Sequence, residues 1–179
     1  VEAKKRQGYK GREIYETNVF GTWEMCRVAA PHLADQHGAI ISITSLAGLR
    51  PTGSSIPYAT SKAALKALTR EMAHDFGPLG VRVNAIAPGE IETSILSPGT
   101  EKIVGTLPLR RLGQPSEVAE VIWFLCSDAS SYVTGTEIEV NAGQVGQDEV
   151  GDADTFDRAE ADRDHARLAG ADQAGFGVF

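Results

Sequence analysis

Tyr58 and Lys62 lie four residues apart at the start of an alanine-rich stretch with helical periodicity, and Ser45 precedes Tyr58 by thirteen residues. Side chains four apart on a helix are neighbours, so this spacing places an ammonium group beside a phenol. A phenol ordinarily titrates near pH ~10, and a positive charge nearby favours the phenolate. Such a tyrosine can take a proton from an alcohol or give one to a carbonyl, while a serine hydroxyl holds the same substrate oxygen. The same spacing also occurs in ordinary amphipathic helices, so the surrounding elements decide between the two interpretations.

Two apolar segments flank these residues. Residues 39–45 form a β-branched run that ends in small hydroxyl residues, and residues 81–90 form a second run, broken at Pro88-Gly89. Both patterns predict buried strands. With the helix between them they predict a parallel βαβ unit. The candidate side chains should then meet at the carboxyl edge of the sheet, where open α/β folds bind ligands.

The remaining elements complete an α/β pattern. Apolar residues at helical spacing predict helices over residues 17–33 and 61–76, and the first of these carries Asn18. Gln114-Pro115 opens a third predicted helix. Residues 137–140 alternate polar and apolar side chains and predict a last strand. From the residues alone, Asn18 suits a helix N-cap and Thr93 a turn, and the wide apolar stripes favour core positions.

Five segments, in order, resemble the short-chain dehydrogenase/reductase family over roughly residues 10–143. They are Asn18 in residues 17–21, Ser45, the Tyr58-x-x-x-Lys62 pair, the Pro-Gly-x-Ile-x-Thr turn at residues 88–93, and residues 108–143. The resemblance implies the C-terminal half of a Rossmann-like, doubly wound parallel sheet. It also implies that helices 17–33 and 61–76 pack against symmetry mates in a homodimer or homotetramer of the full-length protein.

The resemblance assigns roles to the candidate residues. Tyr58 is implied to be the general acid/base, and Ser45 to orient the substrate oxygen. Lys62 is implied to favour the phenolate and to bind the nicotinamide ribose, and Asn18 to support a water-mediated proton relay. The residues implied to line the nicotinamide of NAD or NADP are Tyr58, Lys62, Pro88, Gly89, Ile91 and Thr93. Residues 94–107 are the expected substrate lid.

The sequence also departs from the family pattern. The family begins with a strand and a glycine-rich turn, T-G-x-x-x-G-x-G, that holds the cofactor pyrophosphate, and neither this turn nor the Asn-Asn-Ala-Gly strand end occurs here. We therefore expect a truncated chain in three parts: a basic polar leader (residues 1–13), the C-terminal part of a Rossmann-type domain (residues 14–143) and an acidic tail (residues 144–179). The tail has nine acidic and three basic residues, which predicts disorder, a docking arm or a run-on reading frame.

Composition narrows the function classes. The 179 residues are 42% hydrophobic with net charge −7, and no apolar run approaches the ~20 residues of a membrane helix, so we expect a cytoplasmic protein without a membrane segment. The acidic balance argues against nucleic acid. The four histidines lack metal-ligand spacing, so no metal site is expected. Cys26 and Cys126 lie in apolar helical patterns and are expected to be buried.

These observations favour an NAD(P)-dependent oxidoreductase that interconverts a small-molecule alcohol and a carbonyl. A 3-oxoacyl-carrier-protein reductase is the alternative within the same enzyme class. The absence of the phosphate-binding glycine turn leaves open a third possibility, a non-catalytic fragment unable to bind the cofactor.

Overall fold

The computed structural model describes residues 11–94, 96 and 101–144, and the expectations for the leader's first ten residues and for the tail beyond residue 144 lie outside this part. The described part is α/β, as expected. Its helices and strands are η1 (Glu16–Gly21, a π-helical turn), α2 (Thr22–Ala34), β1 (Ala39–Ile43), α3 (Ile56–Phe76), β2 (Arg82–Pro88), α4 (Glu101–Val104), α5 (Pro115–Cys126) and β3 (Glu137–Val140); short 3₁₀ turns are η2 (Leu46–Gly48), η3 (Gly77–Leu79) and η4 (Asp128–Ser130).

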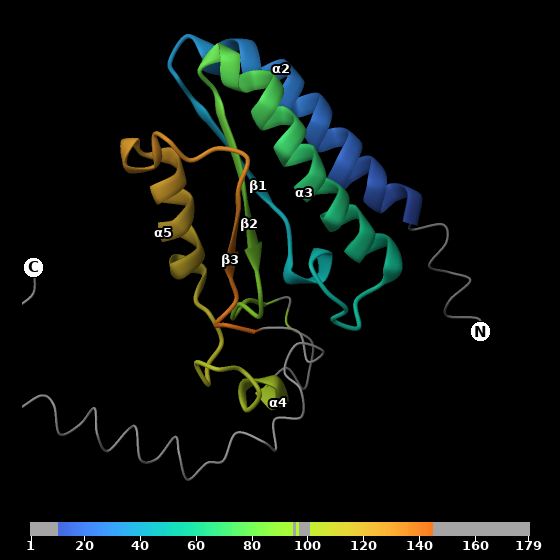
Figure 1. Cartoon of the computed structure of the whole chain (residues 1–179). Helices are drawn as coiled ribbons and strands as arrows, with labels where there is room; N and C mark the ends of the chain where they lie inside the picture. The colour runs from blue at the N-terminus through green and yellow to red at the C-terminus, as the bar shows by residue number, and fades with distance from the viewer. Residues whose placement is uncertain (1–10, 95, 97–100, 145–179) are drawn as a thin grey trace, which may run out of the picture. The chain divides into compact units, whose positions relative to one another are not determined.

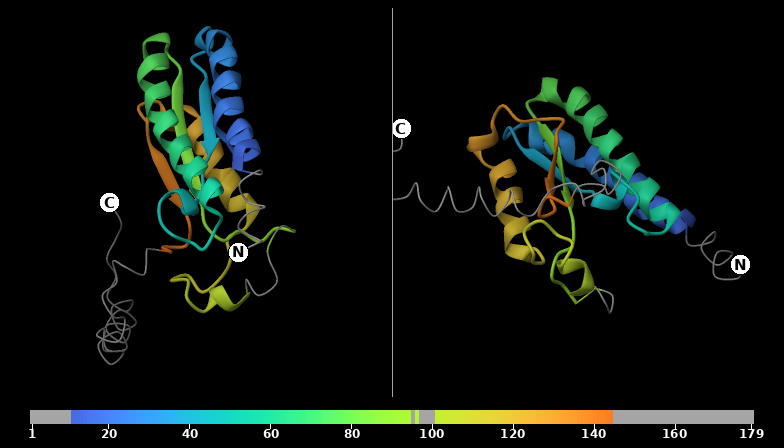
Figure 2. Two further views of the ribbon diagram at one scale, coloured as in Figure 1. Left: turned by 90° about the vertical axis from the view of Figure 1, so that its right-hand side faces the viewer. Right: turned by 60° about the horizontal axis from the view of Figure 1, so that its bottom comes forward.

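Three parallel strands form one sheet in the order β1-β2-β3. Ile43 at the end of β1 pairs with Ile86 of β2, and Ala85 of β2 pairs with Glu137 of β3. Helices α2 and α3 lie on one face of this sheet and α5 lies on the other, and the views in Figures 1 and 2 both show this arrangement. Parallel sheets need such cover on both faces, which explains the continuous apolar runs in their strands.

The central strand β2 is the most buried element of the sheet. Its residues 83–87 are all buried, including the polar Asn84. The Asn84 amide donates to the Val133 carbonyl at 2.8 Å and accepts from the Thr136 N–H at 3.2 Å. Because both ends of the amide are bonded, Asn84 ties β2 to the loop before β3 without an unsatisfied polar group.

Helix α3 begins at Ile56, five residues earlier than the predicted start at Ser61. Pro57 in its first turn explains the early start, because a proline there has a suitable φ and lacks an N–H that would go unbonded anyway. The buried positions Leu65, Met72 and Phe76 recur at helical spacing, as predicted. The earlier start places Tyr58 inside the first turn of the helix.

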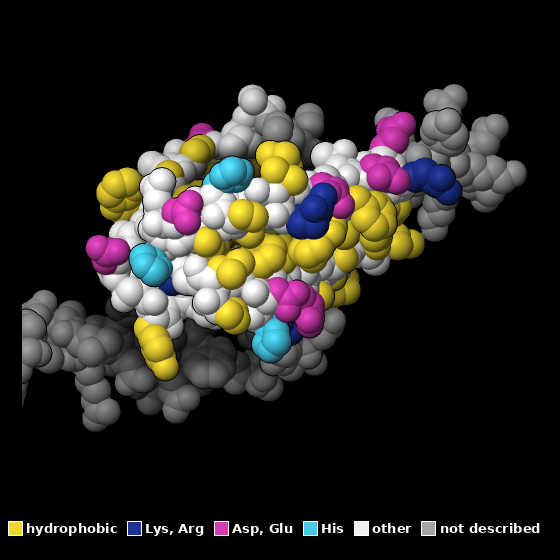
Figure 3. All heavy atoms as spheres, turned by 90° about the horizontal axis from the view of Figure 1, so that it is seen from above, with side chains coloured by type: hydrophobic (Ala, Val, Ile, Leu, Met, Phe, Trp, Pro, Cys, Tyr) yellow, Lys and Arg dark blue, Asp and Glu magenta, His cyan; other side chains and the backbone are white. Residues whose placement is uncertain are grey.

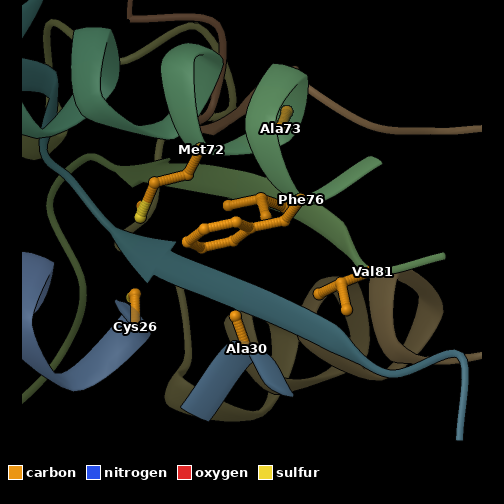
Figure 4. Packing of buried hydrophobic residues seen from close by; sticks show 7 residues of the cluster. Cys26, Ala30, Met72, Ala73, Phe76 and Val81 are labelled. Atoms are coloured by element: carbon orange, nitrogen blue, oxygen red, sulfur yellow. The ribbon is translucent and has the colours of Figure 1, made fainter. Parts of the chain in front are cut away.

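The main hydrophobic cluster joins α2, α3 and the start of β2. Met72 and Phe76 point from α3 toward Cys26 and Ala30 on α2 (Figure 4). The ring of Phe76 stacks on that of Trp23, with centroids 6.4 Å apart. This packing fixes α3 against α2 and so fixes the helix that carries Tyr58 and Lys62.

The first predicted helix differs from expectation in two ways. Residues 11–15 are already helical, and the π-helical turn η1 separates them from α2. In addition, Phe20, Met25 and Val28 are exposed, so the apolar stripe of this helix is only partly buried within the chain. Figure 3 shows hydrophobic side chains gathered in a band on the face seen from above, with charged and histidine side chains around them.

Among the described helices, none combines the length and the apolar character that a membrane crossing requires. Cys26 is buried as expected, but the expectation for Cys126 is wrong: this residue ends α5 with an exposed side chain. The apolar pattern of α5 is continuous over residues 121–126, so periodicity gave no sign of which side faced the sheet.

Candidate active site

The carboxyl ends of β1 and β2 and the first turn of α3 surround an open cavity of about 490 Å³. Six of the residues singled out from the sequence line it together: Ser45, Tyr58, Pro88, Gly89, Ile91 and Thr93. The chain reaches this arrangement because parallel strands end at the same edge of a sheet. Lys62 and Asn18 are outside the cavity lining but contact the elements that form it.

Ser45 directly follows the end of β1 and opens the short turn η2. Its backbone is extended, with φ −170° and ψ 152°, and its hydroxyl accepts a hydrogen bond from the Ala47 N–H at 3.2 Å. The turn then presses on α3 at Gly48, where an added Cβ would lie 2.8 Å from the backbone nitrogen of Ala63. A glycine at this position allows the turn that carries Ser45 to approach α3 closely.

Lys62 lies one helical turn after Tyr58 and close to its ring. The Lys62 Nζ lies 5.8 Å from the Tyr58 ring centroid and donates a hydrogen bond of 2.7 Å to the Ile43 carbonyl at the end of β1. Burial lowers the pKa of Lys62 from its ordinary value. An ammonium group has three donors, so the bond to Ile43 leaves two for other partners.

Asn18 lies in the π-helical turn η1, and its interpretation as a helix N-cap is therefore wrong. Its side-chain amide donates to the Ser61 hydroxyl at 3.1 Å, and that hydroxyl donates to the Tyr58 carbonyl at 2.8 Å. Single π-turns within α-helices are frequent at functional sites. Ser61 is fully buried and was missed by the sequence analysis, where it counted only as the first residue of a predicted helix.

The turn at residues 88–93 is held from two sides. The Gly89 N–H donates to the Val140 carbonyl at the end of β3 at 3.0 Å. Glu92 N–H donates to the Gly113 carbonyl, and Gly113 N–H donates back to the Glu90 carbonyl. The loop before α5 thus fixes the direction in which the turn enters the cavity.

Further cavity residues were missed as site residues by the sequence analysis: Thr52, Ser54, Glu90, Leu96 and Ile103. Thr52 and Ser54 lie between Ser45 and Tyr58 in the chain. This position alone could have predicted that they lie at the same edge of the sheet. Leu96 and Ile103 belong to the predicted lid, of which residues 95 and 97–100 are outside the described part.

The cavity fits the nicotinamide end of a dinucleotide. The backbone turn at Pro88-Gly89 and the side chains of Ile91 and Thr93 share it with the Tyr58 phenol and the Ser45 hydroxyl. Among the residues given, the pattern T-G-x-x-x-G-x-G that would hold the pyrophosphate does not occur. The described residues would therefore meet only the reacting end of such a group.

Comparison with known proteins agrees with this arrangement. A family model described as enoyl-(acyl carrier protein) reductase matches residues 6–144. The chain belongs to the short-chain dehydrogenase/reductase family.

Particular relatives are similar over most of this part. Protein FixR of Bradyrhizobium diazoefficiens is 62% identical over 110 residues, which cover 60% of this chain and 39% of FixR. The 7alpha-hydroxysteroid dehydrogenase of Escherichia coli K12 is 41% identical over 140 residues, 75% of this chain and 55% of that enzyme. The chain thus spans about half the length, or less, of the curated relatives it matches.

Solved structures give the same picture. A 3-oxoacyl-[acyl-carrier protein] reductase from Brucella melitensis with bound NAD superposes with a TM-score of 0.71 at 35% identity, over 76% of this chain and 52% of that one. A 7 alpha-hydroxysteroid dehydrogenase complexed with NADH and 7-oxo glycochenodeoxycholic acid superposes with a TM-score of 0.69 at 40% identity, over 74% of this chain and 55% of that one. The fold of the described part is therefore that of the Rossmann-type members of this family.

Proposed function

We propose that the full-length protein is an NAD(P)-dependent oxidoreductase that interconverts a small-molecule alcohol and a carbonyl. The observation that carries this proposal is the cavity shared by Ser45, Tyr58 and the turn at residues 88–93. Relatives whose names state this kind of chemistry, such as the hydroxysteroid and L-fucose dehydrogenases, support it.

Each residue has a part in proton transfer and orientation. Tyr58 gives a proton from its hydroxyl to the carbonyl oxygen of the substrate, or takes one from the alcohol, and Ser45 holds the same oxygen. Lys62 places a positive charge near the Tyr58 ring, which favours the phenolate. Asn18 fixes the first turns of α3 through Ser61.

The nicotinamide end of the cofactor would lie against Pro88, Gly89, Ile91 and Thr93, with Lys62 available to its ribose. When bound, this group supplies or accepts the hydride at the substrate carbon. The protein contributes the position of the substrate oxygen, the proton and the shape of the cavity.

The test is the substitution Tyr58→Phe in the full-length protein. It removes the oxygen that moves the proton and leaves the ring, so turnover should fall by at least ~100-fold, the lower range of general acid–base contributions. Nicotinamide binding, followed by fluorescence, should change little. Tyr132 is fully exposed and provides the matched control, because Tyr132→Phe removes the same atom far from the cavity lining. Near-normal turnover of Tyr58→Phe would show that another residue moves the proton.

A 3-oxoacyl-carrier-protein reductase is the second candidate, supported by the similarity to the FabG reductase of Aquifex aeolicus and to the Brucella reductase structure. A panel of 3-oxoacyl thioesters, sterols and sugars, assayed with both NAD(H) and NADP(H), separates these substrates. Turnover confined to the thioesters would favour this candidate over the broader proposal.

A further inference from the structure

A buried carboxylate on β3 joins the two elements that carry the proposed catalytic residues. The side chain of Glu137 is 5% exposed, and its Oε2 forms an ion pair of 2.7 Å with the Nζ of Lys66 on α3. Its Oε1 accepts a hydrogen bond of 2.6 Å from the hydroxyl of Thr44.

The two partners of Glu137 lie on the elements that carry the proposed catalytic residues. Thr44 immediately precedes Ser45 and is buried. Its hydroxyl also lies 2.8 Å from the Ile86 carbonyl, so its single proton is shared between that oxygen and the Glu137 carboxylate. Tyr58, Lys62 and Lys66 follow one another at steps of four residues, so the three side chains lie along one side of α3. Glu137 therefore connects the segment after β1, which contains Ser45, to the helix that carries Tyr58.

The buried ion pair between Glu137 and Lys66 is not explained by its contribution to the stability of the fold alone. Removing two charges from water is costly, and a buried ion pair is often no more stabilising than apolar side chains of similar volume. A β3 residue facing α3 at this level needs only an apolar side chain to fill the space. The specific gain from a carboxylate here is a link between Thr44, through a hydrogen bond, and Lys66, through an ion pair.

We propose that Glu137 is a positioning residue that sets the distance between the Ser45 and Tyr58 hydroxyls. It acts through Thr44 on one side and Lys66 on the other. This inference rests on the proposed function, because the two hydroxyls must act on one substrate oxygen. Misplacement of reacting groups by about 1 Å can cost on the order of 100-fold in rate.

The test uses two variants of the full-length protein. The double substitution Lys66→Met/Glu137→Met replaces the ion pair with apolar side chains of similar size, which preserves folding while it removes the tie. Thr44→Val keeps the shape of Thr44 and removes its hydroxyl. Each should lower kcat by about 10- to 100-fold, with substrate KM and nicotinamide affinity changed less than about threefold. Combining them should add little, since both remove the same link.

Thr69→Val is the matched control. Thr69 is another buried threonine, on α3, and its hydroxyl donates only to the Leu65 carbonyl at 2.9 Å. Loss of the Thr69 hydroxyl should affect the stability of the protein without lowering kcat. Wild-type kcat in both Thr44→Val and the double methionine variant would overturn the inference.

Crystal structures separate this result from a failure of the proposed function. In the wild type and in the double methionine variant, the distance between the Ser45 and Tyr58 hydroxyl oxygens is measured directly. A change of about 1 Å supports the positioning role even if no substrate is turned over, and an unchanged distance overturns it. Absence of turnover by the wild type on every alcohol and carbonyl would count against the proposed function alone.

Discussion

Gly48 lies where the turn that carries Ser45 meets α3, and Gly48→Ala tests whether this contact holds the site together. An alanine Cβ would lie 2.8 Å from the Ala63 nitrogen, 2.8 Å from the Lys62 carbonyl carbon and 3.1 Å from the Lys62 Cβ. The first two are backbone atoms inside a helix, which cannot move aside as the end of a side chain can. The turn itself must therefore retreat from α3.

The size of the effect follows from these distances. Reaching ordinary van der Waals contact at 3.4 Å requires a shift of roughly 0.6 Å. Overpacking of this kind costs about 1–3 kcal/mol. Alanine also restricts the unfolded chain, which offsets about 0.4–1 kcal/mol of that cost. We expect a net loss of about 1–2 kcal/mol in the free energy of unfolding, together with a lower kcat, because Ser45 moves with the turn.

Urea denaturation measures the stability term, and steady-state kinetics measure the displacement of Ser45. Gly77 provides the matched control. Gly77 caps the C-terminal end of α3 with φ −54°, and an added Cβ there would meet no atom within 4 Å beyond its chain neighbours and the adjacent helix backbone. Gly77→Ala should be neutral or stabilising by up to about 1 kcal/mol. Equal stability and equal kcat for the two variants would refute the close-contact argument.

Two further predictions concern thiol chemistry and pH. Cys126 is exposed, whereas Cys26 is buried, and burial raises the pKa of the Cys26 thiol. An aromatic disulfide reagent at neutral pH should therefore modify Cys126 alone until urea is added. Two rapidly reacting thiols in the folded protein would contradict this. The Glu117 carboxylate accepts hydrogen bonds from the Arg111 side chain and from the Gln114 N–H, and these bonds lower its pKa from 4.5 to about 2. Because the folded pKa is depressed, the contribution of Glu117 to stability is present above pH 4.5 and lost as pH falls through about 2. An NMR titration midpoint near 4.5 would contradict this lowered pKa.

The local elements followed from the sequence because their causes are local. The apolar runs at residues 39–45 and 81–90 predicted buried strands, which the structure forms over Ala39–Ile43 and Arg82–Pro88. The last strand, residues 137–140, matched its predicted bounds. Gln114 and Glu117 form the capping box that starts α5 at the predicted place. The convergence of Ser45, Tyr58 and the Pro88-Gly89 turn also followed, since a βαβ unit brings strand ends to one edge.

Helix details were less predictable. Nothing in the composition of residues 11–34 distinguishes the π-helical turn at Glu16–Gly21 from regular helix. The same applies to the exposed Cys126. Its side of α5 depends on how that helix rotates against the sheet, and a continuously apolar helix specifies this rotation only weakly.

The sequence by itself determined the elements, their order and the chemistry available at one edge of the sheet. The tertiary structure decided which polar side chains meet. Asn18 bonds to Ser61 across 43 positions, and Thr44 bonds to Glu137 across 93. Such pairs depend on strand register, here Ala85 against Glu137, and on how α3 lies over the sheet. Sequence periodicity reports which face a residue occupies, but a hydrogen bond requires two atoms within about 3 Å, and only the packed elements fix that distance.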